Sequence, residues 1–207
     1  MARLQGEKKV IHLNGNLLCA IDVETTGLDP HKHEIIEICI LPLNSKLEVH
    51  KDIVPFNIFM KPENTEDIEW EAFKVTQVDF MKLCQTGMDK WSAADLFEEW
   101  FQKLKLPERK RISPLAHNWP FDREFIREWL GAASFDLHID GRFRDTMAMG
   151  LAINDQQDAI NEPCPFPKVK LSYMASTLKI DFDKIHNALD DCVLTAKVYK
   201  DLVYKRY

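Results

Sequence analysis

Two carboxylates, two residues apart, end the first apolar run of the chain. The run begins at Leu17, and Asp22 and Glu24 lie near its end, just before a turn signal. Because side chains alternate between the two faces of a β-strand, Asp22 and Glu24 point to the same side. Two such charges repel each other unless a cation lies between them or one carboxylate is protonated. Since both offer only oxygen ligands, the pattern favours Mg²⁺ or Mn²⁺, although an acidic strand end running into a turn has the same pattern.

A third acid lies on the inward face of a predicted helix. A short strand near 111–118 leads into Trp119 and Pro120, and proline is favoured in the first turn of a helix. Asp122 precedes Ile126 by four residues and Trp129 by seven, so it shares the face that packs inward. A carboxylate on a buried face needs a partner, which makes Asp122 a candidate to join the first two acids.

A histidine precedes a fourth acid by five residues near the C-terminus. His186 and Asp191 flank the start of a helix expected at 187–204. Five helical steps of about 100° leave two residues ~140° apart, so the two converge only if His186 lies on the loop before the helix. The same pattern is typical of a solvated helix start, where Asn and Asp are common.

Three blocks, in this order along the chain, resemble the DEDDh (DnaQ-like) family of 3′-to-5′ exonucleases, which includes the proofreading exonuclease subunit of bacterial DNA polymerase III. The blocks are Asp22-Val23-Glu24-Thr25-Thr26-Gly27, His117-Asn118-Trp119-Pro120-Phe121-Asp122 and His186-Asn187-Ala188-Leu189-Asp190-Asp191. The resemblance runs from about Leu17 to Val203. It implies an α/β protein with a ribonuclease-H-like fold, in which helices flank a mixed five-stranded sheet.

The resemblance also assigns roles to the acids. It implies that two Mg²⁺ (or Mn²⁺) ions are held by the four carboxylates and that all five of these residues are catalytic, with His186 as general base: Asp22, Glu24, Asp122, Asp191 and His186. The family spacing selects Asp191 rather than the neighbouring Asp190. Asp145 looks like an auxiliary acid near the site, but an Asp at a strand-to-helix junction is also typical of a helix N-cap.

The terminal nucleotide would lie against the first two blocks. By resemblance, the substrate-binding residues are Thr25, Thr26, Gly27, Leu28, Asn118 and Phe121. Glycine lets a backbone approach a ligand closely, and an apolar side chain can pack on a base without reading its edge. For Leu28 and Phe121, packing in the core is the alternative.

The elements that must position these residues follow from the apolar spacing. We expect strands at 17–23, 34–41, 53–60, near 111–118 and near 143, and the first three should form an antiparallel meander. We expect helices at 63–73, 92–104, 119–131, 171–178 and 187–204, and a further helix that follows the strand near 143 and ends at 153. We expect a single exonuclease domain over 1–207, with 1–16 as a tail or short hairpin. The segments 1–16, 82–91 and 155–170 do not match the bare proofreading subunit, and their role stays open.

The composition excludes some classes of protein. The 207 residues carry a net charge of −6, which argues against a broad basic surface for long nucleic acid but not against a pocket that binds a few phosphates through metal ions. No apolar stretch approaches the ~20 residues that span a membrane, and the polar start lacks the apolar segment of a secretion signal. We therefore expect a cytoplasmic protein without membrane contact. Its five cysteines are scattered and three lie in apolar runs, which favours buried thiols over disulfides or a zinc site.

The expected function is metal-dependent 3′-to-5′ exonuclease activity on single strands, with DNA as the preferred substrate. Release of nucleoside 5′-monophosphates is implied by the resemblance. Two alternatives stay open: trimming of RNA or short oligonucleotides, and a nucleic-acid-binding or scaffold module without catalysis. The expected partners are a single-stranded DNA or RNA 3′ end and either a polymerase or a second copy of the chain.

Overall fold

A computed structural model describes residues 14–76, 78–182 and 187–205 of the chain. Five strands form one sheet in the order β3-β2-β1-β4-β5. They are β1 (Leu17–Thr25), β2 (Ile35–Pro42), β3 (Phe56–Phe59), β4 (Ile112–Ala116) and β5 (Arg144–Asp145). β1, β2 and β3 are antiparallel neighbours, whereas β4 and β5 run parallel to β1. The predicted mixed five-stranded sheet and its antiparallel meander are thus confirmed.

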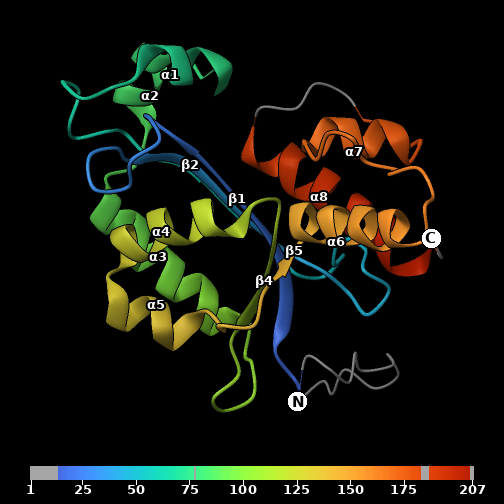
Figure 1. Cartoon of the computed structure of the whole chain (residues 1–207). Coiled ribbons are helices and arrows are strands. Elements are labelled where there is room, and N and C mark those ends of the chain that lie inside the picture. The colour runs from blue at the N-terminus through green and yellow to red at the C-terminus, as the bar shows by residue number, and fades with distance from the viewer. Residues whose placement is uncertain (1–13, 77, 183–186, 206–207) are drawn as a thin grey trace.

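Helices cover both faces of this sheet (Figure 1). They are α1 (Trp70–Thr76), α2 (Phe80–Thr86), α3 (Lys90–Lys103), α4 (Trp119–Leu130), α5 (Ala132–His138), α6 (Thr146–Ala159), α7 (Leu171–Thr177) and α8 (Ala188–Tyr204). In Figure 1, α3, α4 and α5 lie on one side of the sheet and α6, α7 and α8 on the other, while α1 and α2 lie beyond its end. None of the helices in the described part of the chain has the length and apolar character to cross a membrane.

The two faces of β1 pack against different sets of helices. Ile21 and Val23 pack into the core beneath α3, α4 and α5, whereas Ala20 packs into the core beneath α8. Because side chains alternate along a strand, Asp22 and Glu24 lie on the α8 side. The apolar residues between the acids therefore fix the direction in which the acids point.

The sheet opens beside the end of β1. The last β1–β4 pair is Ala20 with Leu115, and β4 ends at Ala116, while β1 continues to Thr25. The carboxyl ends of parallel strands meet at one edge of a sheet, and this is where α/β folds build crevices for ligands. The first turn of α4 enters the space that β4 leaves beside β1.

The structure differs from the expected elements in several places, and α2 (Phe80–Thr86) is among the helices that were not predicted. The segment 63–69 is not helical, because Glu34 Oε2 accepts the backbone N–H groups of Glu63 and Asn64 and holds the chain in a turn. α5 was not predicted, since Gly131, with φ of 75°, ends one helix and the next begins directly after it. The helix expected to end at 153 continues to Ala159 as α6, so part of the segment 155–170 is helical.

Candidate metal centre and active site

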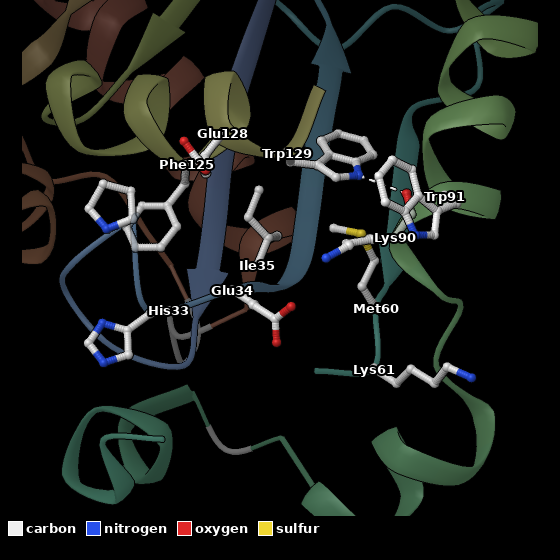
Figure 2. Close-up of a pocket in the computed structure, with 11 residues that line it drawn as sticks. His33, Glu34, Ile35, Met60, Lys61, Lys90, Trp91, Phe125, Glu128 and Trp129 are labelled. Atoms are coloured by element: carbon white, nitrogen blue, oxygen red, sulfur yellow. Dashed lines mark hydrogen bonds between the residues drawn. The ribbon is translucent and has the colours of Figure 1, made fainter. Parts of the chain in front are cut away.

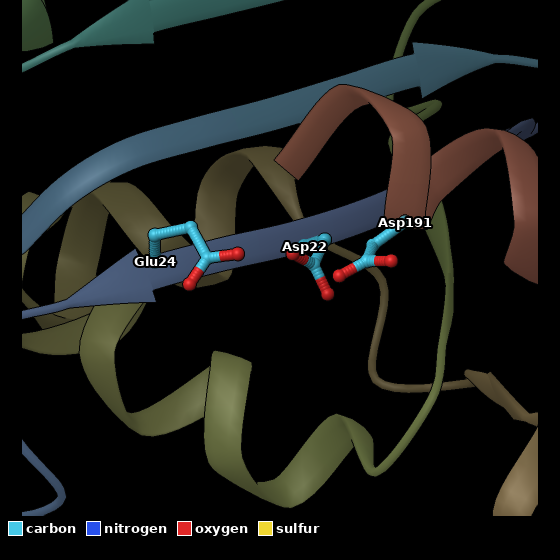
Figure 3. A group of neighbouring side chains, drawn as sticks. All are labelled: Asp22, Glu24 and Asp191. Carbon is cyan, nitrogen blue, oxygen red and sulfur yellow. The ribbon is translucent and has the colours of Figure 1, made fainter. Parts of the chain in front are cut away.

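Three carboxylates from β1 and α8 converge. One oxygen from each of Asp22, Glu24 and Asp191 can be chosen so that all three atoms lie within 4.8 Å of one another. Figure 3 shows Asp22 and Glu24 on β1, with the carboxylate of Asp191 reaching toward Asp22 from α8. The structure therefore brings together Asp22 and Asp191, which are 169 residues apart in the chain.

Asp122 lies beside this group of three rather than within it. Its side chain is 3% exposed, and its Oδ1 accepts the backbone N–H of Val23 at 3.1 Å. Since β4 has already ended, this N–H of β1 faces α4 instead of a strand. The expected inward orientation of Asp122 is confirmed, and its charge lies near enough to raise the pKa of Asp22.

Burial and mutual repulsion favour protonation of these acids. Burial raises the pKa of Asp22 well above its usual value, and the charges of Asp122 and Asp191 raise it further. Burial, followed by the charges of Asp191 and Glu37, raises the pKa of Glu24 to about 8. Burial also raises the pKa of Asp122, and this effect outweighs the hydrogen bonds from backbone N–H groups, which lower it. A divalent cation would relieve this repulsion, and a half-buried set of carboxylate oxygens fits Mg²⁺ or Mn²⁺.

The first turn of α8 separates two neighbouring acids. The Asn187 Oδ1 accepts the N–H of Asp190 at 2.9 Å, and the Asn187 Nδ2 donates to Asp190 Oδ2 at 2.6 Å. Asp190 is exposed, while Asp191 faces β1. His186, the predicted general base, lies outside the described residues.

The loop after β1 uses its polar groups internally. The Thr25 Oγ1 donates to the carbonyl of Gly27 at 2.6 Å, and the Thr26 Oγ1 accepts the N–H of Glu34 at 2.9 Å. Both threonines are buried, so their hydroxyls shape the loop. Leu28 is 69% exposed, which rules out the alternative that it packs in the core.

Gly27 is required by a close contact within this loop. A Cβ at Gly27 would lie 2.6 Å from atoms of the His33 ring. His33 is buried and its Nδ1 accepts the N–H of Asp29 at 2.9 Å. His33 therefore belongs to the interior of this loop, whereas His31 is exposed.

The two predicted substrate-binding residues of the second block lie at the start of α4. Asn118 is the N-cap residue in the left-handed conformation, with φ of 74°. Phe121 is half-buried, with its ring centroid 5.0 Å from that of Phe125. Both lie within four residues of Asp122, so α4 presents this pair together with the acid.

Asp145 caps two helices at once. Its Oδ1 accepts the backbone N–H groups of Met147 and Ala148, which begin α6, and that of Asn118 before α4. Its Oδ2 accepts the N–H of Trp119 at 2.9 Å. Of the two sequence readings of Asp145, the structure supports the N-cap, and it extends this role to the helix that carries Asp122.

Sequence reasoning missed Glu37, a carboxylate inside the apolar strand β2. It is 1% exposed and pairs with Glu24 across the β1–β2 ladder. Its Oε2 accepts the N–H of Ala188, the first residue of α8, at 3.2 Å. The sequence did contain a signal for Glu37, since it is the one charged residue in an otherwise apolar strand. A buried charge is costly without a partner, so such a residue is expected to have one.

A hollow of about 300 Å³ lies between the loop that follows β1, α3 and α4 (Figure 2). Trp91, Phe125 and Trp129 form much of its wall, and the Trp129 Nε1 donates to the carbonyl of Lys90. None of the four predicted metal-binding acids lines this hollow. The hollow has residues of both α3 and α4 in its wall and is separate from the acid cluster.

A mixed five-stranded sheet with an acid cluster on its central strand is the arrangement of nucleases with the ribonuclease-H-like fold. The family model described as Exonuclease matches residues 19–199, and the chain belongs to this exonuclease family. The expected enzyme class, a DnaQ-like 3′-to-5′ exonuclease, is thus confirmed. The family is dependent on divalent metal ions.

Individual relatives show the same relationship. The DNA polymerase III subunit epsilon of Rickettsia conorii is 28% identical over 194 residues, covering 88% of this chain and 72% of that protein. Ribonuclease T of Haemophilus influenzae is 25% identical over 186 residues, covering 86% and 76%.

Among solved structures, exonuclease I shares the fold with a TM-score of 0.74 and 18% identity. The match covers 92% of this chain and 41% of exonuclease I, so this chain spans less than half of that protein. Exonuclease I of E. coli in complex with a dT13 oligonucleotide gives a TM-score of 0.69, with 19% identity over 89% of this chain and 40% of that one.

Proposed function

We propose that this exonuclease removes nucleotides from the 3′ end of single-stranded DNA and releases nucleoside 5′-monophosphates. Its metal ligands would be Asp22, Glu24, Asp122 and Asp191, with His186 as general base. The observation that carries the proposal is the convergence of Asp22, Glu24 and Asp191 within 4.8 Å, with Asp122 beside them. We further propose that 1–207 acts as one exonuclease domain.

The acid cluster supplies what phosphodiester cleavage requires. Divalent cations held there would supply the positive charge that stabilises an in-line displacement at phosphorus. The four carboxylates would hold these ions, and the Val23 N–H would orient Asp122 through its Oδ1. His186 would take the proton of the attacking water, because the ordinary pKa of histidine, near 6.5, suits that transfer at neutral pH.

The chain end would lie between the loop after β1 and the start of α4. Thr25, Thr26 and Gly27 would contribute backbone groups, since the two hydroxyls are engaged within the loop. Leu28 would pack on a base, which its exposure supports, and Asn118 and Phe121 would line the opposite side of the nucleotide.

Two observations bear on the substrate. The epsilon subunit of R. conorii is named for a DNA polymerase, and the structure of E. coli exonuclease I holds a dT13 oligonucleotide, which supports DNA. The name ribonuclease T, given to a relative that is 25% identical, supports RNA trimming as the second candidate. The epsilon relatives also support a polymerase subunit as protein partner, and a second copy of the chain is the alternative.

The test is product analysis on matched DNA and RNA oligonucleotides, each labelled at the 5′ end and assayed with Mg²⁺ and with Mn²⁺. The proposal expects progressive shortening of the DNA strand and release of 5′-monophosphates. A blocked 3′ end should protect the strand, whereas a blocked 5′ end should not. Faster digestion of RNA would favour the second candidate, and binding without shortening under either metal would favour the scaffold.

The role of His186 has its own test. His186→Ala should lower kcat far more than it weakens metal binding, because the side chain acts on the proton and not on the ion. The pH dependence of kcat between pH 6 and 9 is the measurement. A profile identical to that of the wild type would remove His186 as the base.

A further inference from the structure

Glu37 is a buried acid outside the proposed set of metal ligands. Along β2, the alternate residues Cys39 and Leu41 pack into the core beneath α8, so Glu37 also faces α8. Its side chain is almost fully removed from water, at 1% exposed. A carboxylate in such a place is retained at a high free-energy cost unless it accepts hydrogen bonds.

The partner of Glu37 is the first residue of α8. The first N–H groups of a helix have no acceptor within the helix. The side chain of Asn187 accepts the N–H of Asp190, and Glu37 Oε2 accepts that of Ala188 at 3.2 Å. This second bond joins two positions 151 residues apart, so it ties the start of α8 to the sheet.

The same turn of α8 carries Asp191. The N–H of Asp191 donates to the carbonyl of Asn187 at 3.1 Å, so a shift of the turn moves Asp191 with it. On the sheet side, Glu37 is the cross-strand neighbour of Glu24. One carboxylate thus links the strand pair that carries Asp22 and Glu24 to the helix turn that carries Asp191.

We propose that Glu37 is a positioning residue of the exonuclease site: by holding the first turn of α8 on β2, it sets the separation between Asp191 and the acids of β1. This rests on the proposed metal-dependent function. Glu37 touches neither substrate nor metal in this role, and its contribution is a hydrogen bond to the backbone at the start of α8.

Two substitutions separate the hydrogen bond from the charge. Glu37→Gln keeps an acceptor oxygen, so it should retain kcat within about 3-fold. Glu37→Met keeps the length of the side chain but removes the acceptor, and it should lower kcat by about 10- to 100-fold, the range found when supports of metal ligands are removed. KM for the oligonucleotide should change little in either variant.

A second variant removes the bond from the other end. Ala188→Pro deletes the donor N–H at the first helical position, where proline is well tolerated, and the extended conformation of Asn187 suits a following proline. Its effect on kcat should resemble that of Glu37→Met. Both changes break the same hydrogen bond, between the Ala188 N–H and Glu37 Oε2. The kcat of the double variant should therefore be no lower than that of the more impaired single variant.

Two readouts do not depend on nuclease activity. In Glu37→Met, Mn²⁺ binding to the protein alone, measured by calorimetry, should weaken about 10-fold. Amide hydrogen exchange at 187–195 should become faster. The control is Ser113→Ala, which removes a buried side-chain bond to the carbonyl of Arg142 at the other end of the sheet and should change neither readout.

Two outcomes would overturn the proposal. The first is wild-type Mn²⁺ affinity and exchange in folded Glu37→Met and Ala188→Pro. The second is equal impairment of Glu37→Gln and Glu37→Met with unchanged exchange, which would assign the effect to charge. A wild-type protein that digests no strand would contradict the proposed function, while Mn²⁺ binding and exchange would still test the anchor.

Discussion

The carboxylates of Asp22 and Asp191 reach one point from a strand and a helix, so each should be indispensable to metal binding. Asp22→Asn and Asp191→Asn keep size and hydrogen-bonding capacity but remove the negative charge that would bind the proposed cation. We expect kcat to fall by more than about 100-fold in each, because even supports of metal ligands cost 10- to 100-fold. The measurement is cleavage of a labelled single strand at saturating Mg²⁺.

Asp190→Asn is the matched control for these variants. Asp190 is adjacent in sequence to Asp191 but exposed, so this change should leave kcat within about 2-fold of wild type, as substitutions away from functional features usually do. Near wild-type cleavage by Asp22→Asn or Asp191→Asn would refute the metal assignment.

Glu24 should make the stability of the metal-free protein depend on pH. In the folded protein its pKa is about 8, against an ordinary value of 4.5, so the folded state holds the proton more tightly than the unfolded chain. The free energy of unfolding should therefore fall as pH rises from 4.5 to about 8. Urea unfolding in the presence of a chelator at several pH values measures this, and Mg²⁺ should restore stability at the upper end.

Glu24→Gln supplies the control for that titration. The amide carries no charge at any pH in this range, so the decline should be shallower in the variant than in the wild type. An equal slope in both proteins would show that other groups cause it.

At the scale of elements, Asp145 holds the starts of α4 and α6. Asp145→Ala removes all four of its backbone hydrogen bonds and should lower the free energy of unfolding by about 2 kcal/mol or more, since one N-cap contributes about 1 kcal/mol. Asp145→Asn can keep the three bonds made by Oδ1. Urea unfolding and cleavage assays on both variants are the measurements.

The asparagine variant distinguishes the two sequence readings of Asp145. If capping is its role, Asp145→Asn should retain most of the activity, because α4 stays in place with Asp122. A loss of activity as complete as that of Asp22→Asn would instead support an auxiliary catalytic acid.

The loop after β1 should tolerate no side chain at Gly27. Gly27→Ala places a methyl group 2.6 Å from the His33 ring, and overpacking of this kind costs about 1–3 kcal/mol. We expect lower stability by urea unfolding and a higher KM, since the loop is the proposed seat of the nucleotide. Gly141→Ala is the control, because nothing lies within 4 Å of its Cβ. Equal stability of the two variants would contradict the close contact.

At the scale of the molecule, the sequence could predict those features that local spacing determines. Alternation along 17–23 predicted the strand and the common direction of Asp22 and Glu24. Helical spacing after Pro120 predicted α4 and the inward direction of Asp122. In each case apolar neighbours within one or two turns decide the orientation, so the pattern is visible without the fold.

Features that depend on distant partners could not be predicted in this way. Glu37 meets Ala188 only after α8 packs on β2, and Asp145 meets α4 only when β5 pairs with β4. The turn at 63–69 likewise depends on Glu34, which belongs to another part of the sequence. Local propensity favoured a helix there, but the hydrogen bonds from Glu63 and Asn64 to Glu34 hold this segment in a turn instead.

The alternation along β1 limits how its length can vary. A single residue inserted between Leu17 and Asp22 would exchange the two faces, turning both acids into the core beneath α4 and two apolar side chains toward α8. Such an insertion would change no residue type and yet remove the site. Viable relatives and redesigned versions of this strand should therefore differ in length by even numbers of residues, whereas its flanking loops carry no such parity rule.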